Sequence, residues 1–141
     1  MSTALTGSCL CGACTFTAVP EATSGVCHCG MCRTWSGGMF IGVGCGDSLS
    51  FSDGAPVGVY ASSDWGERLF CATCGSTLAW RTTDRKMNVV SVQTFEDPSA
   101  FPLVSEIFYD EKPGSYALAG DTKKMTGAEV MAMFAPPVEG A

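Results

Sequence analysis

Basic residues are scarce in this sequence, and those present are scattered. The chain has 8 Lys and Arg against 14 Asp and Glu, which gives a formal net charge of −6. Proteins that bind nucleic acids usually present a basic face, so a nucleic-acid partner is not expected. A small anionic substrate is compatible with this charge if one or two arginines point into a pocket.

The sequence also has no long apolar run. No stretch approaches the roughly 20 apolar residues that a membrane-spanning helix requires, so no membrane association is expected. The N-terminal segment, residues 1–7, has neither the basic patch nor the apolar core of a secretory signal. We therefore expect a cytoplasmic protein with reduced thiols, in which clustered cysteines indicate metal ligands. The alternative is a secreted domain stapled by disulfides, which the odd number of cysteines disfavours.

Repeats, charge blocks and low-complexity linkers are absent, so we expect one domain that spans residues 1–141. Short alternating segments rich in β-branched and aromatic side chains predict strands. These segments are residues 14–19, 39–45, 68–71, 76–81, 87–95 and 104–109. The fold class is therefore mainly β, with loops pinned by metal.

One helix is expected, near the C-terminus. Thr126 and Glu129 form a capping box that begins it. An apolar stripe follows at helical spacing, which we expect to pack against the core. The stripe consists of Val130, Met133 and Phe134, and Pro136-Pro137 ends the helix.

What the chain has in abundance is cysteine, and seven of its nine cysteines form three clusters. Cys9 and Cys11 are two residues apart, so both sulfurs point to one face of an extended segment. Cys71 and Cys74 are followed by Gly75, as in a zinc-knuckle turn. These two pairs together supply four thiolates, which close one tetrahedral zinc site. The alternative for the second pair is a thioredoxin-like redox motif, but no βαβ pattern surrounds it.

The third cluster is a triad, Cys27, Cys29 and Cys32. One short loop can bring its three sulfurs to a second ion and leave one coordination position open. Closed zinc sites stabilise folds, whereas open zinc sites do chemistry. Cys14 and Cys45 alternate with apolar residues and are expected in the core, although either could close the triad.

His28, the only histidine, lies between two of the triad cysteines. In an extended segment its side chain points away from the metal. It is then exposed or hydrogen bonded. A direct ligand or a proton-transfer role is the alternative.

An open three-thiolate zinc invites a thiol from outside, because the metal stabilises its thiolate. Glutathione, an abundant cytoplasmic thiol, carries two carboxylates. Arg33 and Arg68 are the candidates to pair with them, and Trp35 could form a wall of the pocket. For each arginine, a solvated surface position is the alternative.

At these motifs the chain resembles the glutathione-dependent formaldehyde-activating family, which includes centromere protein V. The resemblance rests on Gly-Ser-Cys-Leu-Cys-Gly at 7–12, on Cys-His-Cys-Gly-Met-Cys-Arg at 27–33 with Ser36-Gly37, and on Phe-Cys-Ala-Thr-Cys-Gly at 70–75. Glu-Asp-Pro at 96–98 is a weaker match. In that family a histidine often stands where this chain has Glu106, and a tryptophan where it has Tyr116.

The resemblance implies a β-tent, a fold of several small coiled β-sheets. It implies a structural zinc on the two cysteine pairs and a second zinc on the triad, where the glutathione thiol binds. It also implies condensation of formaldehyde with glutathione to S-hydroxymethylglutathione, a carbon–sulfur lyase reaction in reverse.

We therefore expect a zinc-dependent carbon–sulfur lyase that adds a glutathione thiolate to a small aldehyde, which the resemblance implies is formaldehyde. The triad would carry the chemistry, and His28 or water would protonate the product. One alternative is a non-catalytic, zinc-stabilised module that binds glutathione or a protein. Another is a metal reservoir, since an exposed three-coordinate site can exchange its ion.

Overall fold

The computed structural model describes residues 3–134 and consists mainly of β-strands in two sheets. The smaller sheet is antiparallel, in the order β1-β2-β5. Its strands are β1 (Leu5–Ser8), β2 (Thr15–Ala18) and β5 (Ser50–Phe51). Apolar and polar side chains alternate along β2, so one face of the strand packs on the core: Phe16 and Ala18 are buried, whereas Thr15 and Thr17 face outward.

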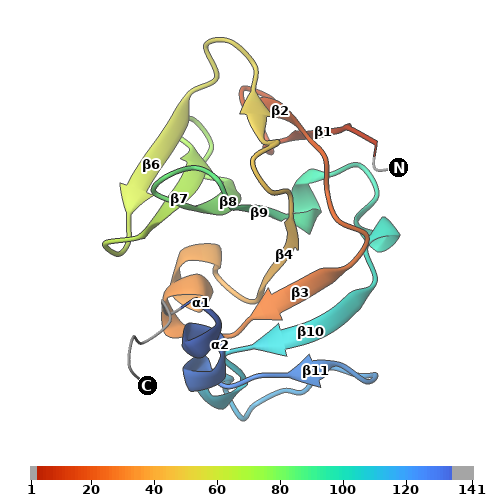
Figure 1. Cartoon of the computed structure of the whole chain (residues 1–141). Helices are drawn as coiled ribbons and strands as arrows, with labels where there is room; N and C mark the ends of the chain where they lie inside the picture. Colours follow the sequence, from red (N-terminus) through yellow and green to blue (C-terminus); the bar gives the residue numbers. More distant parts are fainter. Residues whose placement is uncertain (1–2, 135–141) are drawn as a thin grey trace.

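The larger sheet has the strand order β11-β10-β3-β4-β9-β8-β7-β6. Its pairs are antiparallel except that β10 pairs in parallel with both β3 and β11. The strands are β3 (Ser24–Cys27), β4 (Phe40–Gly44), β6 (Val57–Ala61), β7 (Gly66–Cys71), β8 (Thr77–Thr82), β9 (Asn88–Ser91), β10 (Leu103–Ile107) and β11 (Lys123–Lys124). Figure 1 shows this sheet bending, so that β6 to β8 form one arm and β3, β10 and β11 the other.

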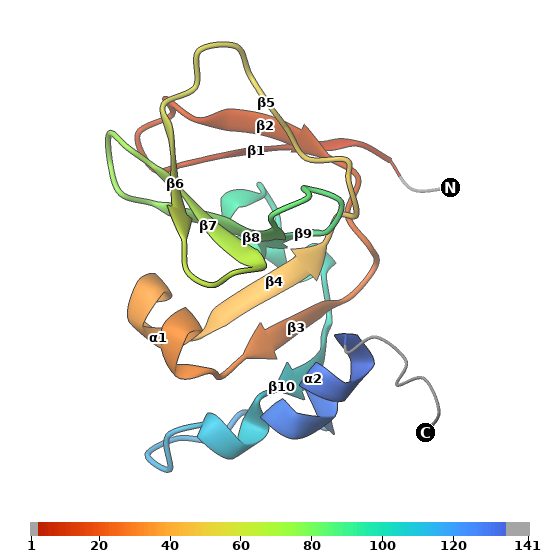
Figure 2. The same cartoon turned by 60° about the vertical axis from the view of Figure 1, so that its left-hand side comes forward.

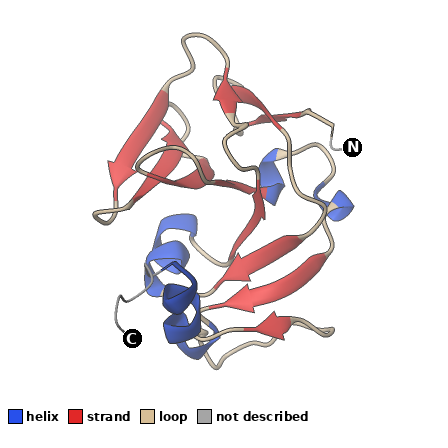
Figure 3. Ribbon diagram, viewed as in Figure 1, coloured by secondary structure: helices blue, strands red, loops and turns tan. Residues whose placement is uncertain are grey.

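Two short α-helices lie at the end of the sheet where β3 and β10 finish (Figures 1 and 3). They are α1 (Gly30–Ser36) and α2 (Gly127–Phe134). Three 3-10 turns complete the structure: η1 (Val92–Thr94), η2 (Pro98–Ala100) and η3 (Tyr109–Glu111). No helix in the described part of the chain has the length and apolar character needed to cross a membrane.

The main core lies where the small sheet packs across the large one (Figure 2). Its aromatic centre joins Phe16 of β2 to Phe95 at 5.6 Å between ring centroids, and Phe95 to Phe101 at 5.3 Å. A smaller cluster forms separately around Phe40, Cys29 and Cys32. The two sulfur clusters therefore belong to different packing units of one fold.

The structure confirms a mainly β fold, and each of the six predicted segments contains a strand. It also adds a short helix, α1, where the sequence indicated only a loop around the triad. The capping box of α2 is confirmed, because Thr126 N donates to Glu129 Oε1 at 3.0 Å and Glu129 N to Thr126 Oγ1 at 3.2 Å.

The predicted core packing of the whole α2 stripe is wrong. Val130 is buried, but Met133 is 66% exposed and Phe134 46% exposed. The helix has only eight residues, and Gly127 and Val130 are its buried residues. The predicted stop at Pro136-Pro137 lies outside the described residues.

Candidate metal sites and active-site cavity

Four cysteine sulfurs meet where two hairpins touch. Cys9 and Cys11 lie in the turn after β1, Cys71 ends β7, and Cys74 lies in the turn before β8. Their sulfurs all lie within 4.8 Å of one another. Cys11 Sγ is 3.7 Å from Cys9 Sγ and 3.8 Å from Cys71 Sγ. We call this group the tetrad; its donor set fits a tetrahedral zinc.

The turn between β7 and β8 prepares two of these sulfurs for metal. Gly75 has a φ of 78°, which glycine adopts without strain, and its N–H donates to Cys71 O at 2.8 Å. The N–H groups of Thr73 and Cys74 both lie 3.4 Å from Cys71 Sγ. The Cys74 N–H lowers the pKa of Cys71, and the Ser76 hydroxyl lowers the pKa of Cys74 to about 5. The turn thus favours thiolates, the form that binds metal.

The triad lies at the junction of β3 and α1. Cys27 ends β3, Cys29 is the N-cap of α1, and Cys32 lies in the first turn of that helix. The three sulfurs lie within 4.8 Å of one another, and Cys29 Sγ accepts a hydrogen bond from Cys32 N at 3.3 Å. Hydrogen bonds from Cys27 and Cys32 lower the pKa of Cys29, whereas the contact with Cys29 raises the pKa of Cys27. These hydrogen bonds therefore favour the thiolate of Cys29 over that of Cys27.

No fourth cysteine or histidine joins the triad within residues 3–134. Cys14 is buried beside the tetrad, where its N–H donates to Cys9 Sγ at 3.2 Å. Cys45 is buried in the main core, with its sulfur 3.6 Å from Val43 O. Both are core residues, as the sequence predicts. The triad could therefore offer three sulfur ligands to a metal ion, with no fourth cysteine or histidine beside it among the described residues.

Arg68 of β7 contacts the triad directly. It is 4% exposed. Its Nη1 donates to Cys32 Sγ at 3.3 Å and its Nε to Ser62 Oγ at 3.1 Å. The guanidinium also lies over the ring of Trp35, 4.9 Å from the centroid. Arg68 thus offsets the negative charge of the triad, and it is not the solvated surface residue that was the alternative.

The other two predicted pocket residues lie at the edge of the triad. Arg33 donates from Nε to His28 O at 2.9 Å, which fixes the loop between Cys27 and Cys29. Trp35 packs on Phe40 at 5.1 Å between ring centroids. These contacts place both side chains in the scaffold of the triad, and neither is among the residues that line the cavity beside it, contrary to the predicted pocket wall at Trp35.

His28 points away from the triad, as the extended conformation predicts. Its side chain is completely buried, with Nε2 2.8 Å from Glu106 Oε1 and the ring between Tyr109 and Tyr116. An ionised carboxylate only accepts hydrogen bonds, so Nε2 carries the proton. His28 Nδ1 has no partner among the described residues. The two positions where the sequence departs from the family pattern, Glu106 and Tyr116, are thus both neighbours of His28.

Glu106 is held ionised by its neighbours. Burial raises the pKa of its carboxyl, but hydrogen bonds from Thr122 and His28 and the charge of Lys124 outweigh burial and bring the pKa below its ordinary value. Lys124 Nζ lies 3.6 Å from Glu106 Oε2. The register of the parallel pair β3–β10 places Glu106 opposite Val26, close to His28. This buried pair joins the triad loop to β10.

A cavity of about 310 Å³ opens directly against the triad. Cys27, Cys29, Cys32 and Arg68 are part of its lining. The rest of its wall comes from strands of both arms and from α2. This is the one described hollow that combines nucleophilic, metal-ligating and cationic groups, so we take it as the candidate active site.

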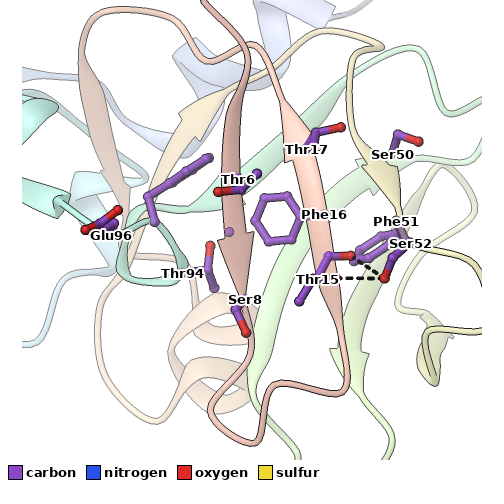
Figure 4. Close-up of a pocket in the computed structure, with 12 residues that line it drawn as sticks. Thr6, Ser8, Thr15, Phe16, Thr17, Ser50, Phe51, Ser52, Thr94 and Glu96 are labelled. Atoms are coloured by element: carbon purple, nitrogen blue, oxygen red, sulfur yellow. Dashed lines mark hydrogen bonds between the residues drawn. The ribbon is translucent and has the colours of Figure 1, made fainter.

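A larger hollow of about 610 Å³ lies over the small sheet. Figure 4 shows its hydroxyl groups, among them Thr15 and Ser52, which hydrogen bond to each other at 2.8 Å. Glu96 is its only ionisable residue, and no cysteine lines it. Volume alone therefore does not identify the reactive site, because the larger hollow lacks groups for the chemistry.

Sequence analysis did not identify the apolar wall of the smaller cavity. Trp65, Trp80 and Phe108 line it together with residues of α2, at positions far apart in the sequence. Two of the three tryptophans belong to this wall, but Trp65 and Trp80 are not neighbours in the sequence and gave no local signal for it. Folding, rather than local spacing, brings these side chains together.

Comparisons with known proteins agree with this geometry. The chain is 35% identical over 127 residues to a protein of Schizosaccharomyces pombe named as an uncharacterized lyase, covering 89% of this chain and 93% of that protein. A crystal structure of a Rhodobacter sphaeroides protein shares the fold, with a TM-score of 0.59 at 22% identity; the match covers 71% of this chain and all of that one. Residues 4–111 match the family described as glutathione-dependent formaldehyde-activating enzyme. The chain therefore belongs to the glutathione-dependent formaldehyde-activating enzyme family.

Proposed function

We propose that this lyase-type protein catalyses the reversible addition of a glutathione-type thiol to a small aldehyde, with formaldehyde as the simplest case. The observation that carries the proposal is the triad, whose three sulfurs lack a fourth partner among the described residues and open onto a cavity. A site built only for stability would be closed, as the tetrad is.

The proposed metal is zinc at both clusters. The tetrad would hold a structural ion through Cys9, Cys11, Cys71 and Cys74, and the triad would hold the second. At the triad a bound zinc would supply a Lewis acid that lowers the pKa of an incoming thiol from its usual value near 8.5.

In the proposed reaction the thiol first loses its proton to solvent. Its sulfur then forms a bond with the carbonyl carbon, and the C=O electron pair moves to oxygen, which takes up one proton. The product is a thiohemiacetal, and the reverse reaction breaks the same C–S bond. Holding both reactants in one small cavity accelerates such an addition mainly through proximity.

Three groups of this chain support the reaction. Arg68 limits the build-up of negative charge at the triad through its contact with Cys32 Sγ. The Cys32 N–H in the first turn of α1 donates to Cys29 Sγ and orients it. His28 does not line the cavity and is fully buried against Glu106, so water is the proton donor to the product oxygen, and His28 is a positioning residue. A reducing compartment such as the cytoplasm, where glutathione is abundant, is the proposed location.

The test is exchange of formaldehyde with glutathione, followed by NMR at chemical equilibrium. Zinc-loaded protein should accelerate exchange beyond the spontaneous rate, and Cys32→Ser should remove the acceleration. Cys45→Ser is the matched control, because Cys45 is a buried cysteine that belongs to neither group of candidate metal ligands. Exchange at the spontaneous rate with the unmodified protein would instead favour a non-catalytic binding module.

A further inference from the structure

The wall of the active-site cavity is mostly apolar and aromatic. Trp65 and Trp80 meet edge to face at 5.3 Å between ring centroids, and Phe134 of α2 lies 5.9 Å from Trp65. Phe40 and Phe108 complete the aromatic part of the lining. Such a wall binds apolar groups through burial of their surface.

Trp65 is 39% exposed, Met131 44% and Phe134 46%. These side chains form an apolar mouth that the described part of the chain does not cover. Cys29, Cys32 and Arg68 line the same cavity and are less than a tenth exposed, so the triad lies deeper in it than this mouth.

The cavity offers little to a charged ligand. Arg68 is the only charged residue among the described residues that line it, and it is already engaged with Cys32, Ser62 and Trp35. Glutathione carries two carboxylates and an ammonium group, and burying them without partners would be costly. These groups must therefore stay outside the aromatic part of the cavity. Formaldehyde, with one carbon, would leave that part empty.

We propose that the substrate is a thiol–aldehyde adduct with an apolar group of several carbons, whose sulfur lies at the triad and whose apolar group contacts Trp65, Trp80 and Phe134. This inference rests on the proposed function for the C–S bond chemistry and adds the substrate class. The group could enter on the carbon side, as a longer aldehyde, or on the sulfur side, as an apolar thiol. In both cases the bonds and protons change as in the formaldehyde reaction.

Binding can be measured apart from turnover. Tryptophan fluorescence should report the binding of S-hexylglutathione and S-methylglutathione to the zinc-loaded protein, since two tryptophans line the cavity. Each buried methylene contributes about fourfold in affinity. If two or more methylenes of the hexyl group are buried, S-hexylglutathione should bind at least about tenfold more tightly than S-methylglutathione. Equal affinities would overturn the inference.

Two methionines of α2 provide a matched pair of variants. Met131 lines the cavity, whereas Met133, on the same helix, does not line it and is 66% exposed. Met131→Asp should reduce the preference for the hexyl compound several-fold, because it places a charge in the apolar wall. Met133→Asp should leave that preference unchanged. Equal effects of the two substitutions would contradict the proposed location of the apolar group.

Two kinetic series identify the source of the group. The first lengthens the aldehyde from formaldehyde to hexanal with glutathione fixed, and the second replaces mercaptoethanol by hexanethiol with formaldehyde fixed. A rise of kcat/KM with chain length in one series supports the inference and assigns the group to that reactant. Turnover of formaldehyde with no rise in either series would overturn the inference and leave the proposed function intact. No turnover at all, together with tight binding of S-hexylglutathione, would overturn the proposed function and leave the apolar binding site intact.

Discussion

At the scale of single residues, the buried contact between His28 and Glu106 ties the triad loop to the rest of the fold. The two side chains are 0% and 2% exposed, and their contact is 2.8 Å. Thr122 donates a second hydrogen bond to the same carboxylate. A buried carboxylate with these partners is costly to remove, because its donors are left unsatisfied. The side chain at 106 therefore contributes to stability and to the position of Cys27 and Cys29.

We predict that Glu106→Gln lowers the free energy of unfolding at pH 7 by roughly 1–3 kcal/mol. The pKa of Glu106 lies below the ordinary value of 4.5 in the folded protein. Its ionised form therefore stabilises the fold above that pH, and this contribution is lost as the pH falls through the folded pKa. The difference in the free energy of unfolding between the unmodified protein and Glu106→Gln, measured by urea unfolding at each pH, should narrow below about pH 4.5.

The matched control for this substitution is Glu67→Gln. Glu67 pairs with Arg81 at 2.9 Å but is 20% exposed, so its loss should cost less. A constant gap for Glu106→Gln from pH 7 to pH 3.5 would show that the charge at 106 does not stabilise the fold.

A second residue-scale prediction concerns Arg68. Hydrogen bonds within the triad lower the pKa of Cys29, and the nearby charge of Arg68 adds to them. Arg68→Ala should therefore make alkylation of metal-free protein by iodoacetamide several-fold slower at pH 7, measured by mass spectrometry of the triad peptide. Arg81→Ala, on the neighbouring strand β8, is the control and should have no effect on that rate. Equal alkylation rates in the unmodified protein, Arg68→Ala and Arg81→Ala would show that Arg68 does not affect the reactivity of the triad.

At the scale of elements, the two sulfur clusters connect different parts of the chain. The tetrad joins the β1–β2 hairpin to the β7–β8 hairpin. Cys11 and Cys71, one from each hairpin, are 60 residues apart in the sequence. The triad joins β3 only to the helix that follows it. A metal at the tetrad therefore closes a long loop, whereas a metal at the triad orders one short segment.

We predict that Cys71→Ser and Cys29→Ser have different consequences. A structural metal site can contribute on the order of 10 kcal/mol to folding, so Cys71→Ser should yield protein that is largely unfolded by circular dichroism. Cys29→Ser should keep the fold and lose one bound metal per chain, measured by elemental analysis. If both variants unfolded to the same extent, the division between a structural and a functional site would be wrong.

The elements also show which features the sequence could predict. Strands such as β2 and β4 have alternating side chains, and the capping box of α2 is local, so both were predictable. β3 escaped prediction because it is four residues long and contains Gly25 and Cys27. α1 escaped because its N-cap is a cysteine sulfur, which is not among the usual capping groups.

At the scale of the whole molecule, the cysteine ligands were predictable because they occur in three compact sequence clusters, at residues 9–11, 27–32 and 71–74. The cavity was not, because its lining extends from Gly25 to Phe134 and depends on how the large sheet bends and where α2 docks. The exposure of Met133 likewise depends on how little of α2 the rest of the fold covers. The sequence therefore predicted the reactive groups, and the fold was needed to locate the space beside them.

The whole molecule thus has a tetrad at the edge of the main core and a triad in a separate, smaller cluster beside the cavity. We predict that the protein binds two metal ions per chain, one in each group, and that an external thiol affects only the ion at the triad. Both ions should be lost at low pH, since thiolate ligands must be deprotonated to bind.

The most direct test is absorption spectroscopy of the cobalt-substituted protein during titration with glutathione. We predict that the sulfur-to-cobalt absorption increases until one glutathione is bound per chain. Cys29→Ser should abolish this response, and Cys45→Ser should leave it unchanged. A spectrum that glutathione leaves unchanged, or a response that survives Cys29→Ser, would contradict this prediction.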